Sequence, residues 1–387
     1  MSTKDLAKSH EDYIIKTRRH FHMYPELSME EIKTTDYIAA ELDQMGIPYI
    51  RPLKSGLVGT IQGKGPGRCV ALRADIDALN VTETNEVDYK SKNAGKMHAC
   101  GHDAHAAMLL GSARILNSLK DQFSGRIHLV FQPGEEVAKG AKALMKAGDW
   151  YDETDSFFGA HIWSNMPSGT VSLEGGPRMA AADMFTIDIK GRSGHGSMPH
   201  QGVDAALMAS ALTMNLQALV SRETSPLDAL ALSVGVVKAG VRWNIIAGSA
   251  RLEGTCRYFS KEIAKTIEDD MRRIAEGTAS TYRGEAVLDY QYLTPPLIND
   301  EASAELAIKA AEKVYSKESI QREPATTGGE DFAFYIQDKP GVFAFIGCAD
   351  PAKGTDQPHH AENFNIDEGV LADGSALYAQ YALDFLA

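Results

Sequence analysis

The stretch M-H-A-C-G-H-D-A-H at residues 97–105 holds three histidines, a cysteine and an aspartate within nine residues. Thiolate, imidazole and carboxylate groups are the side-chain ligands of borderline divalent metals such as zinc. Cys100 and His102 are two residues apart, so in an extended segment they project to the same side and can reach one ion. The alternative is a buried, redox-inert cysteine beside satisfied histidines. We favour the metal site, because no ordinary core or surface segment needs this mixture.

A helix is expected directly after this stretch. Small and apolar residues recur there at helical spacing, namely Ala104, Ala107, Met108, Gly111, Ile115 and Leu119. Asp103 stands just before the first of them, at a position where aspartate often caps a helix. We therefore predict that Asp103 closes the metal-binding loop and starts the helix.

Composition bounds the class of protein. At 387 residues the chain exceeds the usual size of a single hydrophobic core, so two domains are expected. The net charge of -13 argues against a nucleic-acid partner and weakly against an anionic membrane surface. No uncharged apolar run reaches the roughly 18 residues of a membrane span, and the four cysteines form no closely spaced pair. These features predict a cytoplasmic protein with no membrane partner.

Two amphipathic helices are expected over residues 3–20 and 29–45, the second ended by Gly46. Between them, His20 and His22 could be read as metal ligands. Histidines near a helix end more often cap or pack, and we prefer that interpretation here.

A buried strand is expected in R-C-V-A-L-R-A-D-I-D-A at residues 68–78, which ends in alternating acids. Functional groups in open α/β sheets gather just beyond the carboxyl ends of strands. Asp75 could orient a metal-bound imidazole, or it could simply cap a turn, and both interpretations stay open. In the first role it counts among the catalytic residues.

Two further strands end in the same way. Residues 126–131 lead into Q-P-G-E-E, and residues 156–162 contain G-A-H-I-W. Beyond a Pro-Gly turn, Glu135 and Glu136 point in different directions, so one can bind a metal while the other faces the substrate. His161 follows the third strand's small residues. The repeated placement at strand ends favours a functional site over separate incidental motifs.

Between residues 184 and 294 the expected strands and helices follow one another in a different order. Strands and helices are expected there in the order β-α-β-β-α-β, over residues 184–190, 203–221, 229–237, 250–259, 261–282 and 285–292. This order is the split ferredoxin-like unit. We predict an α/β catalytic domain in two parts, 1–183 and 295–387, with this domain inserted as a lid. Its glycine-rich loop exposes His195, either to reach a distant site or merely as a solubilising loop.

Near the C-terminus, Q-P-H-H-A-E-N-F at residues 357–364 places two adjacent histidines after a proline. Such a pair suits a metal or substrate contact, but usually only one of two neighbouring side chains faces the same ion.

These motifs together resemble the di-metal amidohydrolase and metallopeptidase family of aminoacylases, hippurate hydrolases and auxin-amino-acid conjugate hydrolases. The most specific matches are M-H-A-C-G-H-D-A-H, F-Q-P-G-E-E, G-A-H-I-W and G-H-G-S-M-P-H. The resemblance implies a two-metal site and Glu135 as general base. The implied ligands are Cys100, His102, Glu136, His161 and His360, with Cys100 as the bridging ligand.

The resemblance also implies roles for the inserted domain. His195 would act in catalysis, Asn244 and Arg257 would bind the substrate, and the insert would pair two subunits in a homodimer.

One departure from the family pattern is Arg73, because relatives often have a histidine there, and this departure bears on the number of metal ions. Another is the His359–His360 pair, of which we choose His360. A thiolate bridge favours zinc, with manganese and cobalt still possible by ligand type.

The expected function is a metal-dependent amidohydrolase that cleaves N-acyl amino acids to a carboxylate and a free amino acid. A dipeptidase or carboxypeptidase on the same scaffold is the main alternative. An inactive metal-binding protein is the least favoured alternative, because every expected catalytic group is present.

Overall fold

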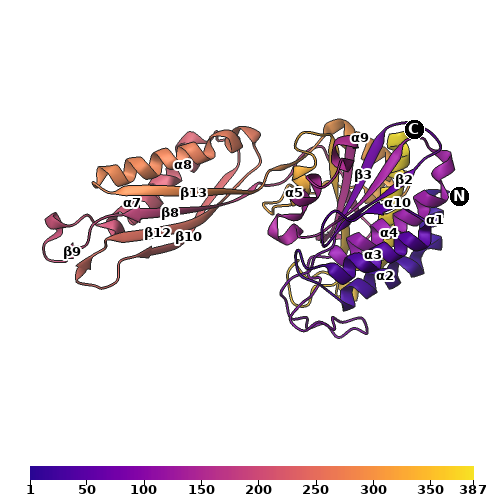
Figure 1. Ribbon diagram of the computed structural model, residues 1–387, viewed down its shortest axis with the longest axis horizontal. Coiled ribbons are helices and arrows are strands. Elements are labelled where there is room, and N and C mark those ends of the chain that lie inside the picture. The colour runs from indigo at the N-terminus through magenta and orange to yellow at the C-terminus, as the bar shows by residue number, and fades with distance from the viewer. The chain divides into compact units, whose positions relative to one another are not determined.

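The computed structural model describes residues 1–387, which divide into two compact units. The first unit comprises Met1–Arg178, Ile298–Pro324 and Asp331–Ala387, and the second comprises Met179–Leu297 and Ala325–Glu330. In sequence, the second unit is thus inserted into the first. Each unit has its own sheet and its own helices (Figure 1).

A seven-stranded sheet forms the centre of the first unit, in the order β1-β2-β4-β3-β5-β15-β6. Its strands are β1 Tyr49–Ile50, β2 Leu57–Gln62, β3 Cys69–Asp75, β4 Arg126–Gln132, β5 Ser156–Pro167, β6 Val171–Ser172 and β15 Gly341–Ala349. β4, β3, β5 and β15 run parallel to one another, and the remaining strands pair antiparallel. The parallel strands are buried along most of their length, as in sheets covered on both faces. Their carboxyl ends therefore meet at one edge of the sheet.

Eight α-helices belong to this unit: α1 Thr3–Ser9, α2 Glu11–Met23, α3 Ile32–Met45, α4 His102–Ser118, α5 Gly140–Met145, α6 Trp150–Glu153, α9 Glu301–Ala311 and α10 Leu371–Leu386. α4 contacts β3, α2 and α10, so its small and apolar residues are almost all buried. The helix predicted after residue 103 is thereby confirmed. The small and apolar residues of α4 recur at helical spacing because this helix packs against other elements on several sides.

The first predicted helix, over residues 3–20, is two helices in the structure. The chain leaves helical geometry at His10, between α1 and α2. The two helices differ in their main partner: Thr3 of α1 donates to Gln380 of α10 (2.8 Å), whereas α2 packs mainly on α4. The second predicted helix begins at Ile32 rather than at Met29, whose φ of 65° is left-handed. Gly46 ends that helix as predicted, with φ 67°.

His20 and His22 pack rather than form a metal site. His20 stacks on Tyr37, with ring centroids 4.1 Å apart. The Nδ1 of His22 lies 2.8 Å from Asp103 Oδ2, and its Nε2 lies 3.2 Å from Glu83 Oε1. Both histidines therefore help to hold the N-terminal helices in place.

The prediction that Asp103 caps α4 is wrong. α4 begins at His102 after Gly101, whose φ of 93° lets the chain turn there. Asp103 lies inside the first turn, fully buried, and its Oδ2 is 2.8 Å from both Arg18 Nε and His22 Nδ1. Burial acts to raise the pKa of this carboxyl, but Arg18 and His22 outweigh burial and hold the pKa well below its usual range.

Replacing Asp103 with alanine is expected to lower the free energy of unfolding by about 3–5 kcal/mol, because it leaves the buried Arg18 guanidinium without this partner. The pKa of Asp103 is depressed in the folded state, so its contribution is present at neutral pH and is lost as the pH falls below the usual range of aspartate. Urea unfolding of the metal-free protein measures the effect. Glu11→Ala, which breaks an exposed pair with Lys8, serves as the control and should cost less than about 1 kcal/mol. Equal losses in both variants would contradict the prediction.

The second unit contains the predicted β-α-β-β-α-β order: β8 Ala182–Lys190, α7 Ala205–Ala218, β10 Leu230–Ala239, β12 Ser249–Tyr258, α8 Lys261–Thr281 and β13 Glu285–Thr294. The strands form an antiparallel sheet in the order β10-β12-β8-β13, and α7 and α8 pack against each other over one core (Figure 1). The segment Ala325–Glu330 joins this unit because Ala180 donates its N–H to the carbonyl of Thr326 (3.0 Å). The remaining strands are β7 Gly176–Met179, β9 Gly194–His195, β11 Ile245–Ile246 and β14 Leu297–Asn299.

No helix in the structure is both long enough and apolar enough to cross a membrane.

Candidate metal site

The predicted ligand and base residues of the first unit gather at the carboxyl edge of its parallel strands. They lie on the loop before α4 and the first residue of α4, on the 3-10 turn Glu135–Val137 after β4, on β5 and on the C-terminal loop. Overlapping groups of possible ligands have all their donor atoms within 4.8 Å of one another. Two such groups, Cys100-His102-His161 and Cys100-Glu136-His360, together contain all five predicted ligands.

His161 and Cys100 face each other across the site. The Nε2 of His161 lies 3.5 Å from Cys100 Sγ. The other ring nitrogen, Nδ1, lies 2.5 Å from the carbonyl oxygen of Ile162 and therefore carries the proton. This hydrogen bond leaves the lone pair of Nε2 directed toward the thiol, as a metal ligand requires.

His102 is held in the same manner by Asp77, a residue that the sequence analysis did not single out. The Nδ1 of His102 lies 3.1 Å from Asp77 Oδ1, while Nε2 lies 3.9 Å from Glu136 Oε1. Asp77 also accepts the backbone N–H of Glu136 (3.0 Å) and the hydroxyl of Ser28 (2.7 Å). The signal for Asp77 was present in the alternating acids after β3, of which only the first was considered.

Asp75, the first of these acids, contacts a different histidine. Its Oδ1 lies 2.5 Å from Nδ1 of His105, and its Oδ2 accepts from Arg73 at 2.8 Å. His105 Nε2 in turn accepts the backbone N–H of Ile162 (2.8 Å). Asp75 is thus linked through His105 to the strand that carries His161. No turn cap is seen for it, and its Oδ2 also lies 3.7 Å from Nε2 of His102.

The two adjacent C-terminal histidines have different surroundings. The Nε2 of His360 lies 3.4 Å from Glu136 Oε1, and its neighbours Cys100 and Glu136 raise the pKa of His360 to about 10. His359 instead accepts the backbone N–H of Ser164 (3.2 Å) and packs against aromatic rings. The structure therefore groups His360, and not His359, with the other predicted ligands.

The donor set fits divalent metal ions. The Nε2 of His102 and the Oε1 of Glu136 are buried without any hydrogen-bond partner. Other candidate ligands and Asp75 lie around these two atoms at 3.4–3.9 Å. Because buried polar atoms are almost always hydrogen-bonded, this arrangement favours a site that binds cations.

Glu135 lies beside the ligands but is oriented differently from Glu136. One of its oxygens accepts the backbone N–H of Asp331 at 3.4 Å, and its carboxylate lies within 4.8 Å of the donor atoms of His102 and Glu136. The side chain of Asp331 is itself held by Arg73 and Gln132, at 2.9 and 2.7 Å. A buried polar network therefore supports Glu135 next to the candidate metal site.

Two of the predicted residues of the second unit lie together, and one lies apart. His195 on β9 pairs with Ile245 on β11, next to Asn244, whose Oδ1 is buried without a partner. The N–H and hydroxyl of Ser197 lie 3.2 and 2.8 Å from Nδ1 of His195, which leaves Nε2–H as a donor. Arg257 stands at the far end of β12, roughly 27 Å along that strand from its start at Ser249 by the usual rise per residue.

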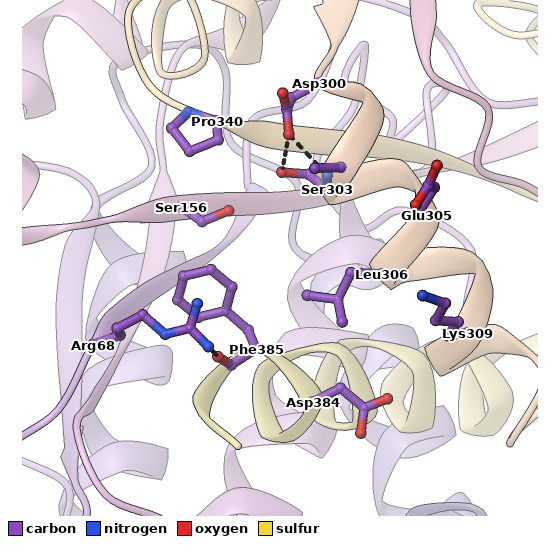
Figure 2. Close-up of a pocket in the computed structure, with 11 residues that line it drawn as sticks. Arg68, Ser156, Asp300, Ser303, Glu305, Leu306, Lys309, Pro340, Asp384 and Phe385 are labelled. Carbon is purple, nitrogen blue, oxygen red and sulfur yellow. Dashed lines mark hydrogen bonds between the residues drawn. The ribbon is translucent and has the colours of Figure 1, made fainter.

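A separate cavity of about 410 Å³ lies at the opposite edge of the first unit's sheet, near the amino ends of β3, β5 and β15 (Figure 2). Several of its polar side chains have partners within the chain: Arg68 lies over the ring of Phe385 at 4.3 Å, and Asp300 accepts the hydroxyl of Ser303 at 2.8 Å. It contains none of the candidate ligands, and we assign it no ligand.

The model of peptidase family M20/M25/M40 matches residues 71–384 of the chain. The chain belongs to this family. The family match confirms the resemblance inferred from the motifs, the α/β fold with its insert and the expected class of hydrolase acting on linear amides.

Individual relatives of this M20/M25/M40 member are similar over most of their length. The N-acetyl-L-cysteine deacetylase of Bacillus subtilis is 40% identical over 369 residues, covering 94% of this chain and 86% of the relative. Thermostable carboxypeptidase 2 of Saccharolobus solfataricus is 37% identical and covers 99% of this chain and 98% of the relative. A solved Bacillus subtilis structure, described as a dinuclear metal-binding peptidase of the M20 family, has 34% identity and a TM-score of 0.86, with 98% and 99% covered. Family membership thus supports two divalent metal ions.

Proposed function

We propose that this M20/M25/M40 member hydrolyses the amide bond of N-acyl amino acids at a two-metal site. The observation that carries the proposal is the gathering of five candidate ligand side chains, two of which have a buried polar atom without a hydrogen bond, with a second glutamate beside them. The similarity to an N-acetyl-L-cysteine deacetylase supports the N-acyl substrate class.

The ligands we propose are Cys100, His102, Glu136, His161 and His360. Divalent ions held by these residues would polarise the scissile carbonyl and lower the pKa of a water molecule toward neutrality. Cys100 would be shared between the two ions. A shared thiolate favours zinc, and manganese or cobalt are the alternatives that these ligand types allow.

Glu135 is the proposed general base. It would take the proton of the attacking water and return it to the nitrogen of the leaving amino acid, a role typically worth about 10²–10⁴-fold in rate. One of its oxygens accepts the backbone N–H of Asp331, a partner that none of the proposed ligands shares. Asp75 and Asp77 would act indirectly, by orienting histidines.

His195, Asn244 and Arg257 are proposed to serve the substrate. The Nε2–H of His195 would stabilise the oxyanion, and Arg257 could grip the substrate carboxylate in a bidentate manner. Arg257 stands at the end of β12 that is farther along the chain from Asn244, which favours two inserted domains over one as the source of these residues. We therefore propose a homodimer in which the two residues at one substrate come from different copies. The cytoplasmic location stays a prediction.

Replacing His195 with alanine is expected to lower turnover by about 10²–10³-fold with unchanged metal content, the usual effect of losing one oxyanion donor. His200→Ala, on the same exposed loop, is the control and should leave turnover unaltered. We propose that His195 serves the active site of the partner subunit, so mixing the His195→Ala protein with a Glu135→Gln protein should partly restore activity, with one complete site in each mixed dimer. Proven mixed dimers without activity would place His195 in its own subunit's site or outside catalysis.

The substrate class is tested by a hydrolysis screen after metal reconstitution. N-acetyl, N-benzoyl and indole-acyl amino acids are compared with unblocked dipeptides, and kcat/KM is measured for each. We expect the N-acyl amino acids to be preferred. A preference for dipeptides would favour the peptidase alternative, which the similarity to a carboxypeptidase supports.

A further inference from the structure

The turn that carries Glu135 and Glu136 is hydrogen-bonded to a second turn, residues 28–31, just before α3. Glu31 is fully buried, and its Oε1 accepts two backbone N–H groups, from Gly134 at 2.8 Å and from Met29 at 2.9 Å. The carboxylate thereby ties its own turn to the first residue of the Gly134–Glu136 turn.

Packing and a second set of hydrogen bonds support the same contact. A Cβ atom added to Gly134 would lie 2.5 Å from the Sδ of Met29, so the two turns touch directly. At the other end of the Gly134–Glu136 turn, the N–H of Glu136 is held by Asp77, which Ser28 also contacts. Both ends of the turn are therefore fixed by groups from outside it.

The turn needs such external support because its own backbone is not regular. Gly134 and Ala138 both have left-handed φ values, 62° and 53°, and for alanine this conformation is unfavourable. Two adjacent glutamates can serve as a base and a ligand only if this backbone keeps one conformation.

The unfavourable free energy of burying the Glu31 carboxylate also argues for a specific role of this residue. Its second oxygen, Oε2, is buried without a hydrogen-bond partner. Burial and the nearby Asp77 raise the pKa of Glu31 to about 7. A carboxyl group kept in such a place is destabilising by itself, so its benefit must come from what its other oxygen holds.

We propose that Glu31 is a positioning residue that holds the Gly134–Glu136 turn and so directs Glu135 toward the substrate and Glu136 toward the metal. This inference rests on the proposed function for the role of Glu135, whereas the effect on Glu136 concerns metal binding alone.

The test compares Glu31→Ala with Glu31→Gln, whose amide oxygen can still accept the N–H of Gly134. Metal affinity is measured by competition with a chromophoric chelator, using zinc as the probe. Glu31→Ala should weaken it by about 10–100-fold, the usual effect of losing a residue that orients a ligand. At saturating zinc, kcat on an N-acetyl amino acid should fall by a similar factor with little change in KM. Glu31→Gln should restore both values to within about threefold of wild type.

Glu41→Ala is the matched control, since Glu41 is also a buried carboxylate but bonds Tyr13 and Arg114 away from the site. In Gly134→Ala the added methyl group would clash with Met29 and disturb the same contact between the two turns. This variant should weaken zinc binding as Glu31→Ala does, and it replaces Glu31→Ala if that protein does not fold. Wild-type zinc affinity in the folded Glu31→Ala or Gly134→Ala protein would overturn the inference, as would equal losses in Glu31→Ala and Glu31→Gln or in Glu31→Ala and Glu41→Ala. If even the wild type cleaves no N-acyl amino acid, the proposed function fails. The measured zinc affinities still decide the role of Glu31.

Discussion

Removing the divalent metal ions is expected to abolish turnover, because no side chain at the candidate site can replace a divalent ion in polarising the scissile carbonyl and activating a water molecule. The acceptors on His102 and Glu136 face the site without a hydrogen-bond partner. Dialysis against a chelator should give an inactive protein, and re-addition of zinc, manganese or cobalt should restore activity. Full activity in a preparation verified as metal-free by elemental analysis would refute the two-metal proposal.

The four cysteines provide the internal control for this expectation. Cys69, Cys256 and Cys348 are buried thiols that belong to no group of possible ligands, whereas Cys100 lies within reach of His161. Cys100→Ser should therefore weaken metal retention strongly, and the same change at the other three positions should not. Equal metal loss in all four variants would mean that the effect is one of stability.

Replacing Glu135 with glutamine should reduce kcat by about two to four decades while the metal content stays near wild type. The amide keeps the volume of the side chain but cannot accept the proton of the attacking water. The structure distinguishes this residue from its neighbour, because the Oε1 of Glu136 lies 3.9 Å from His102 Nε2 and 3.4 Å from His360 Nε2.

Glu136→Gln should accordingly lose metal. Elemental analysis and single-substrate kinetics on both variants separate the two roles. If Glu135→Gln lost metal and Glu136→Gln kept it with a low kcat, the two roles would have to be exchanged.

Much of the architecture could be predicted from local patterns. The strand expected at residues 126–131 is β4 Arg126–Gln132, and the one at 156–162 lies within β5 Ser156–Pro167. The helical period after residue 103 and the strand-helix order of the second unit are likewise present. These features follow from the spacing of apolar residues along short segments, which a single chain displays directly.

Expectations based on a residue's neighbours alone were less successful. Asp103 looks like a helix cap in its own segment, yet it pairs with His22, 81 residues away in the chain. The break at His10 lies where the main packing partner changes from α10 to α4. For Asp103, a tertiary contact of a buried charge outweighs the local preference.

The sequence by itself therefore determined the chemistry of the site: a cysteine, histidines and paired glutamates placed at strand ends, together with the family that these motifs indicate. Only the tertiary structure decided which of several similar groups meets which. It directs Asp77 to His102, leaves His360 beside Glu136 while His359 binds the backbone N–H of Ser164, and places Glu31 against Gly134. The physical reason is that a hydrogen bond depends on distance and direction in space, and neighbours in the sequence can point to opposite sides of the chain.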